Sequence, residues 1–380
     1  MSSTATLMVA ACMGIFIYGY LSAMLGVVLP NLMGKLSVDK AQAGRFFMSV
    51  YIGQLVSSVP SGPAMDRFGT KMVLALGLAL ITFAFLGLGT IDTGKLLYPL
   101  GIVLGLGGSM LVAGENTLVS MINPAARETA ANLLNLFFGV GAFLAPFIVM
   151  PVLKRRGFTA VLVGSSLIPA AVFLLHISLR FPPALQQHGF PLAQASSLLT
   201  EPKLLLLASM VFLYVGTEFS LWNWTVTFFT VERGYEQTNA SRLVSAFAFT
   251  MILGRLGAKW VLAALGPEKT LLLSAVGAAI CLGGMFRGQG RKFVKGSALA
   301  AGLFMAAIFP TSLGLAGRYF PALVGTAISL AITGGWIGAI AIPPSVGFVA
   351  ERRGVTRGLL IPLGAAAVMV VPPSILLALH

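Results

Sequence analysis

The sequence predicts an all-α integral membrane protein with twelve transmembrane helices in two pseudo-symmetric six-helix bundles. Composition is the first reason: hydrophobic residues make up 57% of the 380-residue chain and charged residues only 9%, whereas soluble domains carry about 25% charged residues. The second reason is that apolar windows of about 20 residues, the length that crosses a bilayer as a helix, recur along the whole chain. The third is an internal repeat that relates the two halves.

The expected spans are joined by short connections, except in the middle of the chain. They cover residues 7–32, 43–63, 72–91, 97–122, 130–153, 159–179, 204–230, 241–264, 270–287, 297–317, 323–349 and 358–378. The longest polar stretch separates the sixth span from the seventh. We therefore predict an N-terminal bundle over residues 1–180, a linker over 181–203 and a C-terminal bundle over 204–380. No basic segment precedes the first apolar run, so this run is expected to remain in the mature protein rather than to act as a cleaved signal.

The repeat relates residues of the two halves at a single offset in sequence. It pairs Gly19 with Gly216, Gly69 with Gly266, Gly105 with Gly302, Gly141 with Gly338, Pro146 with Pro343, Arg45 with Arg242, and Arg155-Arg156-Gly157 with Arg352-Arg353-Gly354. Because each half holds an even number of spans, both halves start on the same side of the membrane. Parallel repeats of this kind are typical of transporters whose substrate site lies near the midplane, between the halves.

Charge, cysteine and histidine content exclude several other functions. The net charge is +14, but the basic residues lie singly or in pairs in short loops, which favours contact with anionic lipid headgroups over nucleic acid. Cys12 and Cys281 lie inside apolar spans of different halves, so free buried thiols are expected. His176, His188 and His380 show no spacing typical of metal ligands and are assigned no role. No cofactor, no metal and no nucleophile–base arrangement of an enzyme is predicted.

The stretch from Gly105 to Pro146 holds the most informative polar residues. Glu115 and Asn116 lie in the middle of an apolar span, where a charged side chain costs about 3 kcal/mol and normally faces a protein interior or a watery cavity. The next span carries Asn132 and Asn135 at helical spacing. These two helices offer one acid and three amides to a common space, and we interpret this space as half of a polar substrate cavity.

A charged loop motif follows the second span. It reads Gly62-Pro-Ala-Met-Asp66-Arg67-Phe-Gly69-Thr-Lys71, and it resembles the loop between helices two and three of the major facilitator superfamily. This resemblance implies the major facilitator fold and a gating role, as a cytoplasmic latch, for Asp66, Arg67 and Lys71. The second copy of the motif, around Gly266, is degenerate, and Arg255 is expected to supply the equivalent charge there.

Within that superfamily, the sequence resembles the fucose permease type of sugar:proton symporter over its whole length. The residues that carry the resemblance are Glu115-Asn116, Asn132-x2-Asn135, Gly141-x4-Pro146, Tyr214-Val-Gly216-Thr-Glu218, Trp222-Asn223-Trp224 and Phe309-Pro310-Thr311-Ser312. One departure matters. The family pattern has an acid in the first helix, just before Leu29-Pro30, whereas this chain has Gly26 and no carboxylate in that span. A proton mechanism that needs this first-helix acid therefore does not carry over to this chain, whereas the role of the acid at Glu115 does.

The resemblance implies that helices one, four, seven and ten line the cavity, which brings Glu115 and Glu218 toward it as proton-coupling residues. Burial disfavours the charged form of a carboxyl group, so such residues can bind and release protons. The alternative is that each acid is a permanent structural acceptor for a neighbouring polar side chain.

Trp222, Asn223 and Trp224 offer aromatic faces and an amide, which suit the apolar face and the hydroxyls of a sugar. The alternative for a tryptophan is an anchor at the membrane interface, and we expect one of the two in the cavity and the other at the interface. Gln54 is a weaker substrate-binding candidate. Packing is the preferred interpretation for Tyr18, Tyr20, Thr311 and Trp336.

The resemblance places both termini and the linker on the cytoplasmic side of the plasma (inner) membrane. The loops that this assigns to the outside are rich in basic residues, so the positive-inside rule favours the reverse orientation. They include Lys154, Arg155, Arg156, Arg287, Arg291, Lys292, Arg352 and Arg353. We follow the motif, because the basic pairs recur at the repeat offset and are therefore interpreted as structural.

The predicted function is import of a sugar or a similar small polar solute by a monomeric carrier, driven by the proton gradient, with membrane lipids as its surroundings. One alternative is proton-driven export of amphipathic compounds, for which a more aromatic cavity with fewer amides is expected. Another is a non-transporting sensor with the same fold, although the short termini provide no appended domain.

Overall fold

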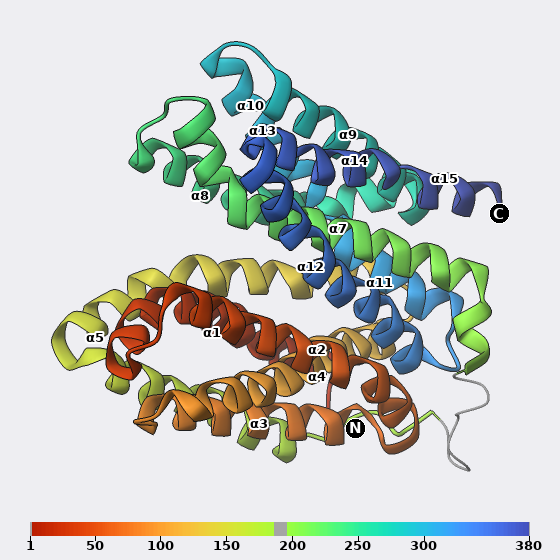
Figure 1. Cartoon of the computed structure of the whole chain (residues 1–380). Coiled ribbons are helices and arrows are strands. Elements are labelled where there is room, and N and C mark those ends of the chain that lie inside the picture. Colours follow the sequence, from red (N-terminus) through yellow and green to blue (C-terminus); the bar gives the residue numbers. More distant parts are fainter. Residues whose placement is uncertain (1, 186–195, 380) are drawn as a thin grey trace.

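The computed structural model describes residues 2–185 and 196–379, and no strand occurs within them. Ten helices in these ranges are long and apolar enough to cross a membrane. The longest of them covers two expected spans, and one further helix, which is more polar, corresponds to the second span. Each of the twelve expected spans therefore has a helical counterpart, and the predicted fold class is confirmed (Figure 1).

The first half of the chain packs its helices around a common core. Its elements are α1 (Thr4–Leu36), α2 (Lys40–Phe68), α3 (Thr70–Thr90), the 3-10 turn η1 (Gly94–Leu96), α4 (Leu97–Ile122) and α5 (Arg127–Ser178). The ribbon of α5 contains two helices joined at Gly157, where φ is 78° and ψ is 172°. We call these parts the first and second segments of α5. Helix α1 packs on α5, and α4 packs on both α2 and α3.

The second half repeats this arrangement with more interruptions. Its elements are η2 (Leu198–Thr200), α7 (Pro202–Thr227), the π-helical turn η3 (Phe228–Glu232), α8 (Gln237–Leu265), α9 (Pro267–Arg287), α10 (Arg291–Met305), α11 (Ile308–Tyr319), α12 (Val324–Arg353), α13 (Val355–Gly358), α14 (Leu360–Val368) and α15 (Val371–Ala378). The expected span 297–317 is divided between α10 and α11. Pro310 has no N–H and its ring crowds the carbonyl four residues earlier, and this carbonyl, of Ala306, accepts a hydrogen bond from Arg255 instead, at 3.4 Å.

Glycines at the repeat offset adopt matching backbone conformations. Gly69 and Gly266 each separate two helices at positive φ, 86° and 78°, and Gly157 and Gly354 do the same at 78° and 88°. At these φ values a side chain is strained, which explains why glycine stands at all four turns. The sequence repeat is therefore also a repeat of turn geometry.

The two halves touch mainly through three pairs of helices, α2 with α12, α5 with α8 and α5 with α11. We call the side of the molecule where α2 ends and α12 begins the latch face. Both chain termini lie toward this side, at the right of Figure 1. Most of the polar contacts between the halves lie toward this face.

Large apolar side chains cover the outside, among them Phe83, Phe147 and Ile280, each more than half exposed. Buried polar residues gather inside, which is the distribution expected in lipid. Cys12 is buried and Cys281 half-buried, and both are free thiols, as predicted.

Candidate functional site

The first contact between the halves is made by the loop motif. The Asp66 carboxylate lies at the start of α12, where it accepts hydrogen bonds from the backbone N–H groups of Gly325 and Thr326, both at 2.8 Å, and from the Thr326 hydroxyl at 2.6 Å. The Asp66 side chain is buried. An anion at a helix N-terminus satisfies free N–H groups and is favoured by the helix dipole. Asp66 therefore joins the end of α2, in the first half, to the start of α12, in the second half.

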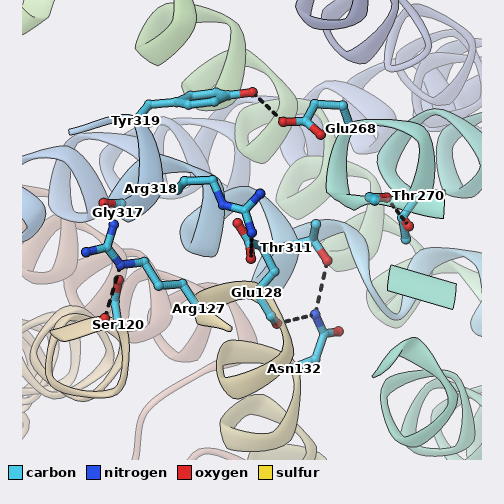
Figure 2. A network of polar contacts seen from close by, with 11 residues as sticks. Ser120, Arg127, Glu128, Asn132, Glu268, Thr270, Thr311, Gly317, Arg318 and Tyr319 are labelled. Atoms are coloured by element: carbon cyan, nitrogen blue, oxygen red, sulfur yellow. Dashed lines mark hydrogen bonds and ion pairs between the residues drawn. The ribbon is translucent and has the colours of Figure 1, made fainter. Parts of the chain in front are cut away.

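A second set of contacts joins α5 to α11, and Figure 2 shows it. Arg318 pairs with Glu128 at 2.7 Å. Arg127 donates to the carbonyls of Ser120, at 3.2 Å, and Gly317. These interactions tie the start of α5 to the end of α11 on the latch face.

Two further contacts extend this set. The Asn132 amide donates to the Thr311 hydroxyl at 3.0 Å, one turn deeper than Glu128. Within the second half, the Tyr319 hydroxyl donates to Glu268 at 2.8 Å (Figure 2). The degenerate second copy of the motif thus contributes Glu268 to the latch face.

Lys71 of the motif makes its hydrogen bonds within the first half. Lys71 donates to the carbonyls of Ile177, at 2.7 Å, and Leu179, at 2.9 Å, which end the second segment of α5. Arg67 lies over the ring of Phe68, with 5.8 Å between guanidinium and ring centroid. The motif therefore connects the end of α5 to the contact that Asp66 makes with α12.

Glu115 lies inside the first half and pairs with a histidine. Its Oε1 is 2.9 Å from Nε2 of His176, and neither side chain is exposed. Gly14 of α1 packs against this carboxylate so closely that a Cβ there would overlap Oε1. The pair lies where α1, α4 and the second segment of α5 meet.

From the sequence, His176 was assigned no role, and the structure corrects this interpretation. His176 follows Glu115 by 61 residues, and no spacing rule predicts a contact across that separation. Only the packing of α5 against α4 brings the two together. The apolar setting of His176 was the one available indication that its ring needs a partner.

Two of the three amides bond to each other. The Asn135 amide donates to Oδ1 of Asn116 at 2.9 Å and to the carbonyl of Ala131, and Asn116 donates to the carbonyl of Val112. Both side chains are buried. Asn116 and Asn135 are therefore grouped as predicted, and in this conformation each of their amide nitrogens already donates a hydrogen bond, whereas Asn132 bonds to Thr311.

Arg255 was expected to supply the charge that the second copy of the motif lacks, and it lies on α8, ten residues before the end of that helix at Leu265. It is 7% exposed and donates to the carbonyl of Asn135 in the other half, at 2.8 Å. A position near the middle of the helix, rather than the loop, puts its charge between the two halves. This contact joins the two halves, and the role of Arg255 in gating stays a prediction.

Glu218 lies on α7, in electrostatic contact with Arg255 and close to the buried Tyr214 hydroxyl. That hydroxyl has no hydrogen bond of good geometry among the described residues. The two embedded acids thus have different surroundings. Glu115 has a histidine within its own bundle, whereas Glu218 has an arginine that also reaches the other half.

The aromatic candidates on α7 lie on different sides of the helix. Trp222 is 40% exposed and lines an apolar pocket with Leu221, Thr225, Leu243, Val244, Phe247, Met285 and Ala298. Trp224 lies against α12 at Gly347, and Asn223 is exposed.

The remaining polar candidates have partners on other helices, either in the same half or in the other half. Gln54 is buried and donates to the Tyr18 hydroxyl at 2.5 Å. Tyr20 lies 3.3 Å from the Ser165 hydroxyl, within the first half. Trp336 donates to Ser109 of the other half at 3.1 Å, so it contributes to the contact between halves.

These features define a multi-pass membrane transporter whose two halves are held together by polar contacts on one face. Residues 11–291, well over half of the chain, match the family model of the Major Facilitator Superfamily. The chain belongs to this superfamily and is a transporter rather than an enzyme.

Individual relatives are more distant. The chain is 26% identical over 381 residues to the glucose/galactose transporter of Brucella abortus biovar 1 (strain 9-941), which covers 92% of this chain and 88% of that protein. Among solved structures, the fucose:proton symporter FucP of E. coli superposes with a TM-score of 0.83 at 20% identity, covering 97% of this chain and 98% of FucP. A structure of FucP in the outward conformation gives a TM-score of 0.82 at 19% identity, with the same coverage. These structural likenesses establish the fold.

Proposed function

We propose that this protein imports a sugar or a similar small polar solute together with protons, by alternating access of a site between its two halves. The observation that carries the proposal is the buried Glu115, an ionisable side chain kept away from lipid at the position matching the sugar:proton symporter pattern. Embedded carboxylates of this kind mark proton relays in transporters. The named function of the Brucella relative supports a sugar as the solute.

The polar contacts of the latch face supply one half of an alternating-access cycle. We assign this face to the cytoplasm, because it carries the loop motif, and we assign the described conformation to a state closed toward the cytoplasm. The likeness to FucP in the outward conformation supports this assignment. Opening would have to break the contacts made by Asp66, Glu128 and Arg255 across the halves.

In this proposal Asn132 and Gln54 supply hydrogen bonds to the solute, Asn116 and Asn135 bond to each other beside it, and Trp222, Asn223 and Trp224 supply stacking and an amide. Glu115 and Glu218 carry the protons. Asp66, Arg67, Lys71 and Arg255 act in gating. No cofactor is needed, because the proton gradient drives accumulation.

Uptake of radiolabelled monosaccharides into proteoliposomes tests the proposal. Accumulation is expected only with an inward proton gradient, and it should collapse when a protonophore removes that gradient. Equal uptake with and without the gradient would contradict proton coupling. No uptake of any sugar in the panel would contradict a sugar as the solute.

A second candidate function is proton-driven export of amphipathic compounds. The apolar pocket beside Trp222 favours it, because aromatic and aliphatic walls suit an apolar ligand. Quenching of tryptophan fluorescence by amphipathic cations, compared with Trp222→Phe, tests this alternative. Efflux of such a compound from loaded vesicles, without any sugar uptake, would favour export over import.

A further inference from the structure

The hydrogen bonds of His176 determine how many protons its pair with Glu115 holds. The Nδ1 atom lies 2.9 Å from the carbonyl oxygen of Val172. A carbonyl can only accept a hydrogen bond, so Nδ1 carries a proton. The remaining hydrogen bond, between Nε2 and Oε1 of Glu115, then contains one proton, on the imidazole or on the carboxyl. In either form the buried pair has no net charge.

The same geometry leaves a place for a second proton. Oε2 of Glu115 is buried and has no hydrogen-bond partner among the described residues. A proton bound there converts the neutral pair into a protonated carboxyl and an imidazolium, so the net charge changes from 0 to +1. The imidazolium then lacks a negative partner in an environment that penalises isolated charge.

The charged and titratable groups around the pair come from two helices. From α1, the Cys12 thiol faces Glu115. From α3, the Lys71 ammonium is held by the carbonyls of Ile177 and Leu179, directly after His176. The ring of Phe181 lies against the imidazole, with 5.7 Å between centroids. An imidazolium at His176 without a negative partner would therefore repel the Lys71 ammonium, which is held at the end of the same segment of α5.

Lys71 leads from the pair to the contact between the halves. It follows Gly69, the turn between α2 and α3, and this turn follows Asp66, which holds the start of α12. A loss of the bonds to Ile177 and Leu179 would free the turn that positions the Asp66 carboxylate. The distance in sequence between Lys71 and Asp66 is only five residues, so little slack separates the two contacts.

We propose that Glu115 and His176 form a single proton-binding unit, and that His176 is a positioning residue whose charge, through Lys71, weakens the hold of Asp66 on α12. Binding of a second proton then favours opening of the latch face. The proposal rests on the proton-coupled part of the proposed function and is independent of the solute. It also explains how a chain without an acid in its first helix can respond to protons.

The test follows the width of the latch face against pH in the full chain, reconstituted in lipid nanodiscs without any solute. Spin labels at positions 72 and 265 report the distance between the halves, because Met72 and Leu265 are both exposed. The labels are attached to non-canonical residues, so that Cys12 beside Glu115 stays unchanged. Between about pH 8 and pH 5, the ratio of open to closed molecules is expected to rise at least about tenfold, which lies within the range of about 5- to 150-fold that is typical of coupling between two sites. The infrared carboxyl band reports protonation of Glu115 in the same samples.

Two variants separate the proton-binding unit from its transmission. His176→Gln keeps a side chain that can donate to Glu115 but removes the imidazolium, so the latch face should stay closed at all pH values. Lys71→Met should leave the carboxyl band titrating as in the wild type while the distance no longer changes. Lys269→Met changes an exposed lysine near the latch face; it is the control and should titrate as the wild type does.

Each other outcome overturns the proposal. If the distance in the wild type does not respond to pH, the latch face does not open on protonation. If His176→Gln responds as the wild type does, His176 has no part in the opening. If Lys71→Met responds as the wild type does, Lys71 does not link the charge of His176 to the contact between Asp66 and α12. If His176→Gln does not fold, Lys71→Met still decides the question, because Lys71 is only half-buried and lies outside the buried pair. Failure of sugar uptake with an intact pH response would instead overturn the proposed solute.

Discussion

At the scale of single residues, the hydrogen bonding of Glu115 depends on its partner His176 more than on its own helix. Its partner His176 can act as a hydrogen-bond acceptor when neutral, because Nδ1 carries the proton bonded to Val172. A glutamine at position 115 could donate to that acceptor. The structure therefore separates the loss of a titratable group from the loss of a hydrogen bond.

Glu115→Gln is predicted to change the free energy of unfolding by less than about 1 kcal/mol, since a typical hydrogen bond contributes about that amount and this one is kept. Accumulation driven by a pH gradient should be abolished, while exchange of solute across the membrane continues, because exchange moves no net protons. Uptake and counterflow in proteoliposomes measure the two activities. A variant that still accumulates solute against its gradient would contradict the coupling role.

The three asparagines are predicted to behave differently from one another. Asn132 has a buried carbonyl oxygen without a partner among the described residues, so a solute hydroxyl can bind there, and Asn132→Ala should weaken binding by about 5- to 150-fold, or about 1–3 kcal/mol. Asn116 and Asn135 already bond to each other. Their alanine variants should each lower stability by about 0.6 kcal/mol, the average for such bonds between membrane helices.

A double-mutant cycle checks the second half of this prediction. Because one hydrogen bond is shared, Asn116→Ala with Asn135→Ala should cost less than the sum of the single variants. Asn239→Ala, in an exposed position, is the matched control for both affinity and thermal stability. Additive stability losses, or a large loss of affinity in Asn116→Ala alone, would assign the pair to the solute instead.

At the scale of elements, the helix ends are set by backbone conformation at a few glycines. Gly157 has positive φ and has no atom within 4 Å of the position that a Cβ would occupy. Gly164, in the second segment of α5, also has open space but has an ordinary helical conformation. The two glycines therefore differ in backbone strain and not in packing.

Gly157→Ala is predicted to destabilise the protein by about 1–3 kcal/mol, because this region of φ and ψ is almost restricted to glycine. Gly164→Ala should be neutral or stabilising by up to about 1 kcal/mol, since alanine is the better helix former. Thermal unfolding in detergent compares the two. Equal effects would mean that the turn between the two segments adapts without strain.

At the scale of the whole molecule, the orientation in the membrane that we propose rests on assigning the latch face to the cytoplasm. Single cysteines at Gln187, in the part of the linker outside the described residues, and at the exposed Arg155 would lie on opposite sides of the bilayer. An impermeant thiol reagent on intact cells is predicted to label the Arg155 variant, with the Gln187 variant labelled only after the cells are opened. The reverse pattern would support the charge rule and invert the assignment of both termini.

The sequence by itself determined the class, the helices and the repeat. Apolar length fixes where a chain crosses a bilayer, because every buried backbone group must be bonded within its own helix. Glycines needed at positive φ fix the turns, so Gly69 and Gly266 identify the repeat without any structure. Both are local properties, and local properties can be derived from the residues alone.

The tertiary structure decided which buried polar groups meet. His176 reaches Glu115 and Arg255 reaches Asn135 only after helices distant in sequence pack together. A buried polar side chain must find some partner, but the sequence does not state which helix supplies it. For that reason the sequence named Glu115 and the asparagines, whereas the histidine partner and the depth of Arg255 came from the packing of the two halves.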